Sequence, residues 1–203
     1  MIKYPNGMTK TTVVETKNKK KDVRKSHLGV DFEDLINESN QYYLSKNVAS
    51  IYKKPTPIQI VKVEYPSRNK ARITEAYYRM PSTTDYNGIY KGKYIDFEAK
   101  SCHFNSFPFK NIYDHQIKHL ETVQTMGGIS FLIIEFSLHH EVFLLPTTDL
   151  VNLYNESLKD GRKSIPYEYF KEHAYQLKLG FNPRINYLDV VDILIEKANN
   201  NLG

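Results

Sequence analysis

The feature that most constrains this chain is the pair Lys91-Gly92, which separates two stretches of alternating apolar and polar residues. We interpret the pair as a two-residue hairpin loop, which would place Asp85 across from Glu98 and Thr83 across from Lys100. Side chains alternate between the two faces of a strand, so these four would share one face. The other face would carry an apolar set, namely Tyr86, Ile95, Phe97 and Ala99. We therefore expect a hairpin anchored in a core, with a polar patch above it.

Two opposed carboxylates indicate a metal site. At Cβ separations of roughly 5 Å they repel each other, and a hard divalent cation between them would remove the repulsion. Mg²⁺ prefers oxygen ligands and retains waters, which leaves room for a phosphate oxygen and an attacking water. Lys100 shares the face of Glu98, so its ammonium group would stabilise the negative charge that builds up during hydrolysis. Thr83 adds a neutral oxygen, and Gln116 adds a direct or indirect contact from the first turn of a following predicted helix.

The pattern thus predicts metal-assisted hydrolysis of a phosphodiester. The predicted catalytic residues are Asp85, Glu98 and Lys100, and the pattern itself predicts Asp85 and Glu98 as the metal ligands.

Another interpretation of the same residues remains open at this point. An Asp followed by Glu-x-Lys occurs by chance in many basic proteins. The alternative is a surface ladder in which Lys100 pairs with neighbours of Glu98 and Asp85 begins a turn with Asn87-Gly88.

Other groups of residues in the sequence are weaker candidates for a metal or catalytic site. His115 and His119 have the i, i+4 spacing of zinc ligands but lack the intervening glutamate and a third ligand nearby, so histidines facing solvent or DNA are favoured. Glu33 lies on or beside the apolar stripe of the first predicted helix, where it is either a boundary charge or a supporting residue of the metal site. Cys102-His103 is too sparse for zinc, and the absence of a phosphate-binding glycine loop argues against ATP hydrolysis.

Periodicity along the chain predicts an α/β fold with a mixed central sheet flanked by helices. We expect helices over 28–43, 114–125, 147–160 and 187–198, and a further helical piece from Pro166. Strands are expected over 48–52, 129–136 and 141–145, with a loop over 101–110 and Asp114 as a helix cap. Residues 58–79 predict a β-ribbon with its turn at 66–70, and two prolines at its entry favour a projecting stalk over an edge hairpin.

Positive charge gathers in two segments of the 203 residues. Residues 1–26 carry a net +6 and residues 53–80 a net +5, which leaves −6 for the remainder. We therefore expect a basic arm over 1–26, disordered until a partner binds, and a single domain over 27–203 with the stalk inserted at about 53–80. For the arm, a merely solubilising role is the alternative. The candidate DNA-binding residues are Lys53, Lys54, Arg68, Lys70, Arg72 and Arg79.

The sequence also bears on cellular location. No apolar run approaches the length of a membrane span, the N-terminus lacks the apolar segment of a signal peptide, and Cys102 has no cysteine with which to pair. The expectation is a non-secreted, cytoplasmic protein without a membrane partner.

Several long motifs carry a family resemblance. They are KKPTPIQIV at 53–61, EAYYR at 75–79, STTDYNG at 82–88 and YIDFEAK at 94–100, with shorter matches at 106–108, 114–116 and 183–185. These stretches resemble the RecU family of Holliday junction resolvases, which belongs to the restriction-endonuclease-like PD-(D/E)xK nucleases. The likeness runs from about residue 29 to the last predicted helix.

The resemblance implies Mg²⁺ bound by Thr83, Asp85, Glu98 and Gln116, with Mn²⁺ as a substitute and Lys100 as transition-state stabiliser. It also implies that the ribbon is a stalk that enters the centre of a four-way DNA junction, with a DNA contact near its tip at Arg68. Paired symmetric nicks require two sites related by a dyad, so we expect a homodimer. Recombinase and branch-migration proteins are expected partners in recombination and DNA repair.

Two departures from the family pattern bear on these expectations. Leu28 stands where members commonly have Arg, which removes one expected DNA contact, and the loop between Lys100 and Ser106 is about one residue shorter than in many members, which affects the alignment of Gln116. Two other functions remain open: a different nickase or restriction-like nuclease on the same core, and a non-catalytic DNA-binding recombination mediator.

Overall fold

The computed structural model describes residues 31–79 and 83–200. At its centre lies a six-stranded sheet in the order β1-β4-β5-β7-β8-β10. Its strands are β1 (Ala49–Lys53), β4 (Tyr86–Tyr90), β5 (Lys93–Cys102), β7 (Ile129–Phe136), β8 (Glu141–Pro146) and β10 (Tyr175–Gln176). β5 and β7 run parallel and the other neighbours are antiparallel, so the sheet is mixed as predicted.

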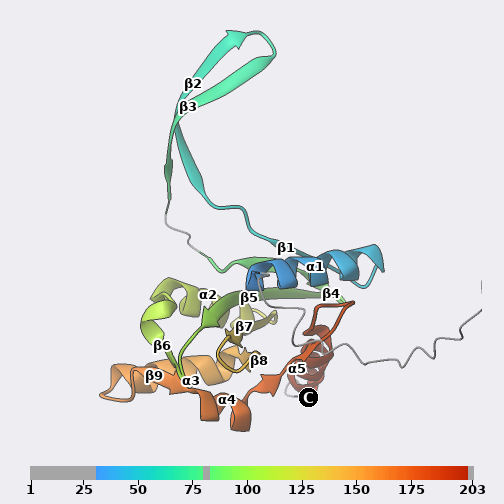
Figure 1. Cartoon of the computed structure of the whole chain (residues 1–203), viewed down its shortest axis with the longest axis vertical. Helices are drawn as coiled ribbons and strands as arrows, with labels where there is room; N and C mark the ends of the chain where they lie inside the picture. The colour runs from blue at the N-terminus through green and yellow to red at the C-terminus, as the bar shows by residue number, and fades with distance from the viewer. Residues whose placement is uncertain (1–30, 80–82, 201–203) are drawn as a thin grey trace, which may run out of the picture.

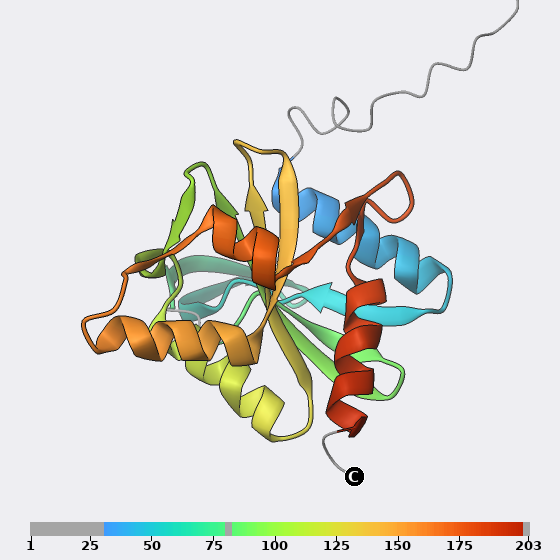
Figure 2. The ribbon, with the colours of Figure 1, turned by 90° about the horizontal axis from the view of Figure 1, so that it is seen from below.

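Helices cover both faces of the sheet (Figures 1 and 2). α1 (Phe32–Ser45) and α5 (Leu188–Asn200) pack on one face, while α2 (Asp114–Thr125), α3 (Thr147–Leu158) and α4 (Tyr167–His173) pack on the other. The strand β7 is almost entirely buried because apolar layers lie on both of its sides. On the α1 side, Tyr86, Phe97 and Phe131 stack across three adjacent strands, with ring centroids 4.8 and 4.9 Å apart.

The hairpin register is confirmed. Tyr86 pairs with Phe97 and Tyr90 with Lys93, so Lys91-Gly92 form the loop. Both loop residues have positive φ, 49° and 74°, which matches the twist of the flanking strands. β4 begins only at Tyr86, so the ladder does not extend to the predicted pairing of Thr83 with Lys100.

The polar face of this hairpin is covered, because the side chains of Asp96 and Glu98 are fully buried. The reason is that α2 packs over this face of β5, which the alternation of the strand alone does not reveal.

The stalk is confirmed as a projection. β2 (Ile58–Ser67) and β3 (Lys70–Tyr78) form a two-stranded ribbon that extends away from the body (Figure 1). Nearly all of its side chains are exposed, so it has no core of its own. Its turn lies between the paired residues Ser67 and Lys70, within the predicted segment.

Several element boundaries differ from the expectations. Asp31 caps α1 by accepting from the backbone N–H of Glu33, so that helix begins later than predicted. Tyr113, not Asp114, precedes the first residue of α2, because Gln116 reaches back to the Tyr113 N–H. The predicted loop 101–110 contains the end of β5, the short strand β6 (Ser106–Pro108) and a 3-10 turn (Phe109–Asn111).

The C-terminal part adds strands that periodicity did not indicate. β9 (Ser164–Pro166) pairs with β6, β11 (Lys178–Leu179) pairs with β12 (Ile185–Asn186), and β10 completes the sheet. The predicted arm 1–26 and Leu28 lie outside the described residues. Across 31–79 and 83–200, no helix is both long and apolar enough to cross a lipid bilayer.

Candidate active site

Three predicted catalytic residues meet at one point on the sheet. The buried Glu98 carboxylate accepts the backbone N–H of Asp85 at 3.1 Å through Oε2, and the Lys100 ammonium lies 2.5 Å from Oε1. Gln116, from the first turn of α2, donates its amide Nε2 to Oε1 of Glu98 at 2.7 Å. The hairpin therefore supplies both carboxylates and the lysine, and α2 closes the site from above.

The electrostatics of Glu98 favour neutralisation. The pKa of the Glu98 carboxyl is raised from 4.5 to about 8, chiefly by burial; the charge of Lys100 opposes this rise and the neighbouring Asp85 adds to it. A carboxylate removed from water beside another acid is costly to ionise unless a cation joins it. This arrangement fits a divalent cation between Asp85 and Glu98.

The donor set indicates which kind of cation. Within the described ranges, no group of three or more His, Cys, Asp or Glu residues is arranged to hold a metal. Two carboxylates supplemented by neutral oxygens and water are the environment that Mg²⁺ accepts, whereas structural zinc sites need four nitrogen or sulfur ligands. Asp85 and half-buried Thr83 stand two residues apart, just before the start of β4.

Gln116 takes a specific orientation here. Its Oε1 accepts the Tyr113 N–H at 3.0 Å, which caps α2, and its Nε2 points to Glu98. The contact with the site is therefore made through Glu98. Direct ligation through Oε1 would require the amide to turn and to release the cap.

The ladder alternative is wrong. Lys100 pairs with Glu98 itself, and Asn87-Gly88 lie inside β4 instead of forming a turn. Gly88 is required there because a Cβ would lie 2.1 Å from the carbonyl oxygen of Ser50 on β1.

The histidines of α2 do not converge on a zinc ligand set. The ring of His115 stacks on Tyr113 with centroids 5.4 Å apart, whereas His119 Nε2 lies 3.2 Å from Asp96 Oδ2. His119 thus belongs to a neighbouring cluster.

That cluster, centred on Asp96, is a feature that the sequence interpretation missed. Asp96 is fully buried and receives four donors: Lys54 Nζ at 2.9 Å, Tyr94 Oη at 2.9 Å, His119 and the Thr84 hydroxyl. The signal was available, because Asp96 precedes Glu98 by two residues and so shares its face of β5.

Some of the candidate DNA-binding residues lie on the stalk and others on the body. Arg68, Lys70 and Arg72 lie exposed at or beside the stalk turn. In contrast, Lys53 pairs with Glu33, so the Glu33 carboxylate binds a lysine beside the site.

The other two basic candidates also have partners. Arg79 donates to the side chain of Gln59 at 3.1 Å, at the base of the stalk. Lys54 is directed to Asp96 and is mostly buried, so it does not lie free for DNA in this arrangement.

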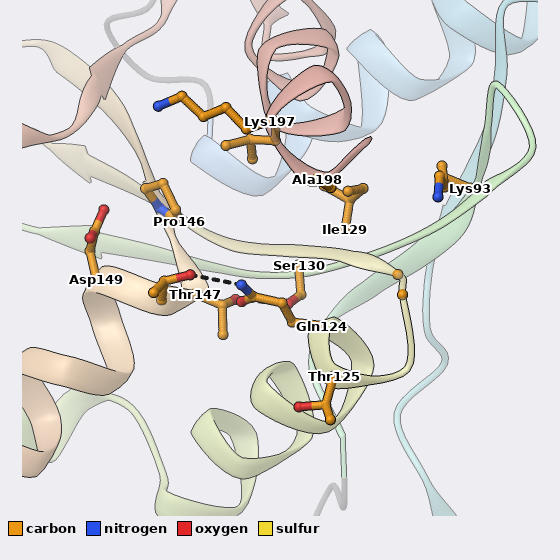
Figure 3. A pocket seen from close by; sticks show the side chains of 14 residues that line it. Lys93, Gln124, Thr125, Ile129, Ser130, Pro146, Thr147, Asp149, Lys197 and Ala198 are labelled. Carbon is orange, nitrogen blue, oxygen red and sulfur yellow. Dashed lines mark hydrogen bonds between the residues drawn. The ribbon is translucent and has the colours of Figure 1, made fainter. Parts of the chain in front are cut away.

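A separate cavity of about 430 Å³ lies where β7 begins, between the C-terminal end of α2, the start of α3 and the end of α5 (Figure 3). Lys93 and Lys197 lie at its sides, and Gln124 donates to Thr148 within it at 2.7 Å. It contains none of the predicted site residues.

Comparisons with known proteins agree with the geometry. The model of the family described as "Recombination protein U" (RecU) matches residues 27–193. The protein named Holliday junction resolvase RecU from Bacillus cytotoxicus is 46% identical over 195 residues, covering 95% of this chain and 98% of that protein. The protein of the same name from Lactococcus lactis subsp. cremoris is 46% identical over 213 residues, covering 97% and 99%.

Among solved structures, the fold is similar to that of Archaeoglobus fulgidus Hjc, a Holliday junction resolvase from an archaeal hyperthermophile. The TM-score is 0.42 at 11% identity, covering 71% of this chain and 91% of that one.

Proposed function

This chain belongs to the RecU family, and from that membership and the site geometry we propose that it is a Mg²⁺-dependent, structure-selective endonuclease that resolves four-way DNA junctions. The observation that carries the proposal is the meeting of Asp85, Glu98 and Lys100 at one point of the β4-β5 hairpin. The proposed substrate, a Holliday junction, is taken from the names of the relatives.

Each residue of the site has a distinct role in this proposal. Asp85 and Glu98, with Thr83, would hold the cation, and Gln116 would join them as a ligand if its amide turned to release the cap of α2. Mn²⁺ would substitute for Mg²⁺. When bound, the ion supplies Lewis acidity toward a phosphate oxygen and a more acidic water.

The chain's own contribution is orientation and charge. Gln116 and the Asp85 N–H fix the plane of the Glu98 carboxylate through two hydrogen bonds. The Lys100 ammonium is held beside the carboxylate with only 23% of its side chain exposed, where its field is weakly screened. Lys100 would there stabilise the negative charge that develops on the phosphate oxygens during cleavage.

Selectivity for junctions is assigned to the stalk. A four-way junction differs from a duplex chiefly at its open centre, and β2-β3 is an exposed basic projection long enough to stand apart from the body (Figure 1). Arg68, Lys70 and Arg72 would there contact phosphates that converge from several arms.

Paired nicks require two copies of the site. We therefore include in the proposal a homodimer with a twofold axis, which would direct one site to each of two opposed strands. We also propose that the protein acts in the cytoplasm together with recombinase and branch-migration proteins.

The experiment is single-turnover cleavage of a four-way junction and of linear duplexes with the same arm sequences, with Mg²⁺ or EDTA. Asp85→Ala is the test variant, and Asp192→Ala, which removes an acid paired with Lys91 in the hairpin loop, is the matched control. We expect Mg²⁺-dependent cleavage of the junction by the wild type and by Asp192→Ala only.

Two results would contradict the proposal. Equal cleavage of linear duplex would favour a nickase without junction selectivity. Junction binding without any cleavage, at all Mg²⁺ and Mn²⁺ concentrations, would favour a non-catalytic mediator.

A further inference from the structure

Both legs of the stalk contact one buried carboxylate of the body, Asp96. Lys54 directly follows β1 on the outgoing leg, and Thr84 directly precedes Asp85 on the returning leg. Lys54 Nζ lies 2.9 Å from Asp96 Oδ2, and the Thr84 hydroxyl donates to Asp96 Oδ1. Lys54 and Thr84 are also hydrogen-bonded to each other at 3.0 Å, so the three groups form a closed set.

The set is shielded from solvent. Asp96 is fully buried, Thr84 is 3% exposed and the Lys54 side chain is 20% exposed. Tyr94 and His119 complete the donors to Asp96, so both of its oxygens are occupied by the protein. Four donors from separate parts of the chain therefore meet at Asp96, which suits it to hold other groups in place.

Asp85 depends on this set for its position. The regular β4-β5 ladder begins at Tyr86, so Asp85 lies just outside it. Two backbone contacts hold Asp85: its N–H bonds to Glu98, and its carbonyl accepts the N–H of Lys54 at 2.7 Å. Its chain neighbour Thr84 is bonded to Asp96. Thr84, which precedes Asp85 in the sequence, and Lys54, whose N–H bonds to the Asp85 carbonyl, are thus both bonded to Asp96.

We propose that Asp96, with Lys54 and Thr84, is a positioning clamp that holds both stalk legs on β5 and keeps Asp85 within reach of Glu98. This inference rests on the proposed function, because it assigns the clamp a role in the cation site. Groups that orient metal ligands typically change metal affinity or activity by about 10–100-fold when removed.

The test variant is Thr84→Val, which is close in shape and lacks the hydroxyl donor, and Thr84→Ser restores the donor. Thr148→Val is the matched control, since Thr148 is an exposed threonine that accepts a side-chain hydrogen bond on α3. Mn²⁺ binding to the DNA-free, full-length protein is followed by EPR, and single-turnover junction cleavage is measured over a Mg²⁺ titration.

We expect Thr84→Val to bind Mn²⁺ about 10–100-fold more weakly, or to cleave that much more slowly at saturating Mg²⁺. Junction affinity in Ca²⁺ should stay within about twofold of the wild type, because the stalk tip is unchanged. Thr84→Ser and Thr148→Val should behave as the wild type in all three measurements.

Lys54→Met tests the other leg, with Lys91→Met as its control, and the DNA-free Mn²⁺ measurement separates its effect from any loss of a DNA contact. The clamp is wrong if a folded Thr84→Val or Lys54→Met variant binds Mn²⁺ and cleaves as the wild type does. It is also wrong if Thr84→Val weakens junction binding and cleavage in the same proportion with unchanged Mn²⁺ affinity. Failure of the wild type to cleave the junction would instead overturn the proposed function.

Discussion

Replacing Glu98 with Gln should make the metal-free protein more stable at neutral pH. Burial raises the pKa of the Glu98 carboxyl from 4.5 to about 8 in the folded state. Between these two values the folded protein holds a proton that the unfolded chain has released. The contribution of Glu98 to stability is therefore fully present below about pH 4.5 and is lost as the pH rises toward 8.

The size of the stability loss follows from the pH range between the two pKa values of Glu98, 4.5 in the unfolded chain and about 8 in the folded protein. Each pH unit inside it costs about 1.4 kcal/mol, so the loss is on the order of 3 kcal/mol by pH 7 and on the order of 5 kcal/mol above pH 8. Gln carries no charge and has nearly the shape of protonated Glu, so Glu98→Gln escapes this pH-dependent loss. Its NH₂ group cannot accept a hydrogen bond as a Glu98 oxygen does, and that cost is the same at every pH. For a chain of this size, each kcal/mol raises the melting temperature by about 2–4 °C.

The assay is urea denaturation of the wild type and Glu98→Gln in EDTA at pH 5, 6, 7 and 8. Glu135→Gln, which changes a glutamate on the adjacent strand β7 bonded to Ser101, serves as the control. The stability difference between Glu98→Gln and wild type should grow by about 1.4 kcal/mol per pH unit. A difference that stays constant within about 0.5 kcal/mol from pH 5 to 8 would refute the reasoning.

Three further predictions concern catalysis and DNA binding. Lys100→Met should slow single-turnover cleavage by about 10²–10³-fold while junction affinity in Ca²⁺ is retained, because it removes one stabilising charge, and near-normal cleavage would contradict its role. Replacing residues 58–76 with a short turn should lower junction affinity far more than duplex affinity in competition binding, and an unchanged ratio would assign selectivity elsewhere. Deleting residues 1–26 should weaken DNA binding and flatten the slope of log K against log salt by ~0.9 for each lost phosphate contact, and an unchanged slope would show that the arm does not touch DNA.

The hairpin was predictable because short-range rules determine it. Lys91-Gly92 sets the loop, and the alternation of side chains then places Glu98 and Lys100 on one face, where Glu98 accepts the N–H of Asp85. The apolar run of β7 likewise predicts a central strand, since only burial on both faces tolerates it.

What could not be predicted depends on contacts distant in sequence. The burial of Glu98 arises from α2 lying across the sheet, and the raised pKa of Glu98 follows from that burial. Asp96 accepts hydrogen bonds from Lys54, which precedes the stalk in the sequence, and from His119 on α2. No local sequence pattern connects these residues. β10 has only two residues, too few for periodicity to indicate a strand.

The most direct test of the central claim is the product formed from a supercoiled plasmid that extrudes a cruciform, a four-way junction. A dimer with two Asp85–Glu98–Lys100 sites should nick two opposed strands within one binding event and yield linear DNA. Nicks made singly would relax the plasmid, the cruciform would be reabsorbed, and only nicked circles would accumulate. We expect linear product with Mg²⁺ from the wild type and none from Asp85→Ala, whereas nicked circles alone from the wild type would contradict paired cleavage by a dimer.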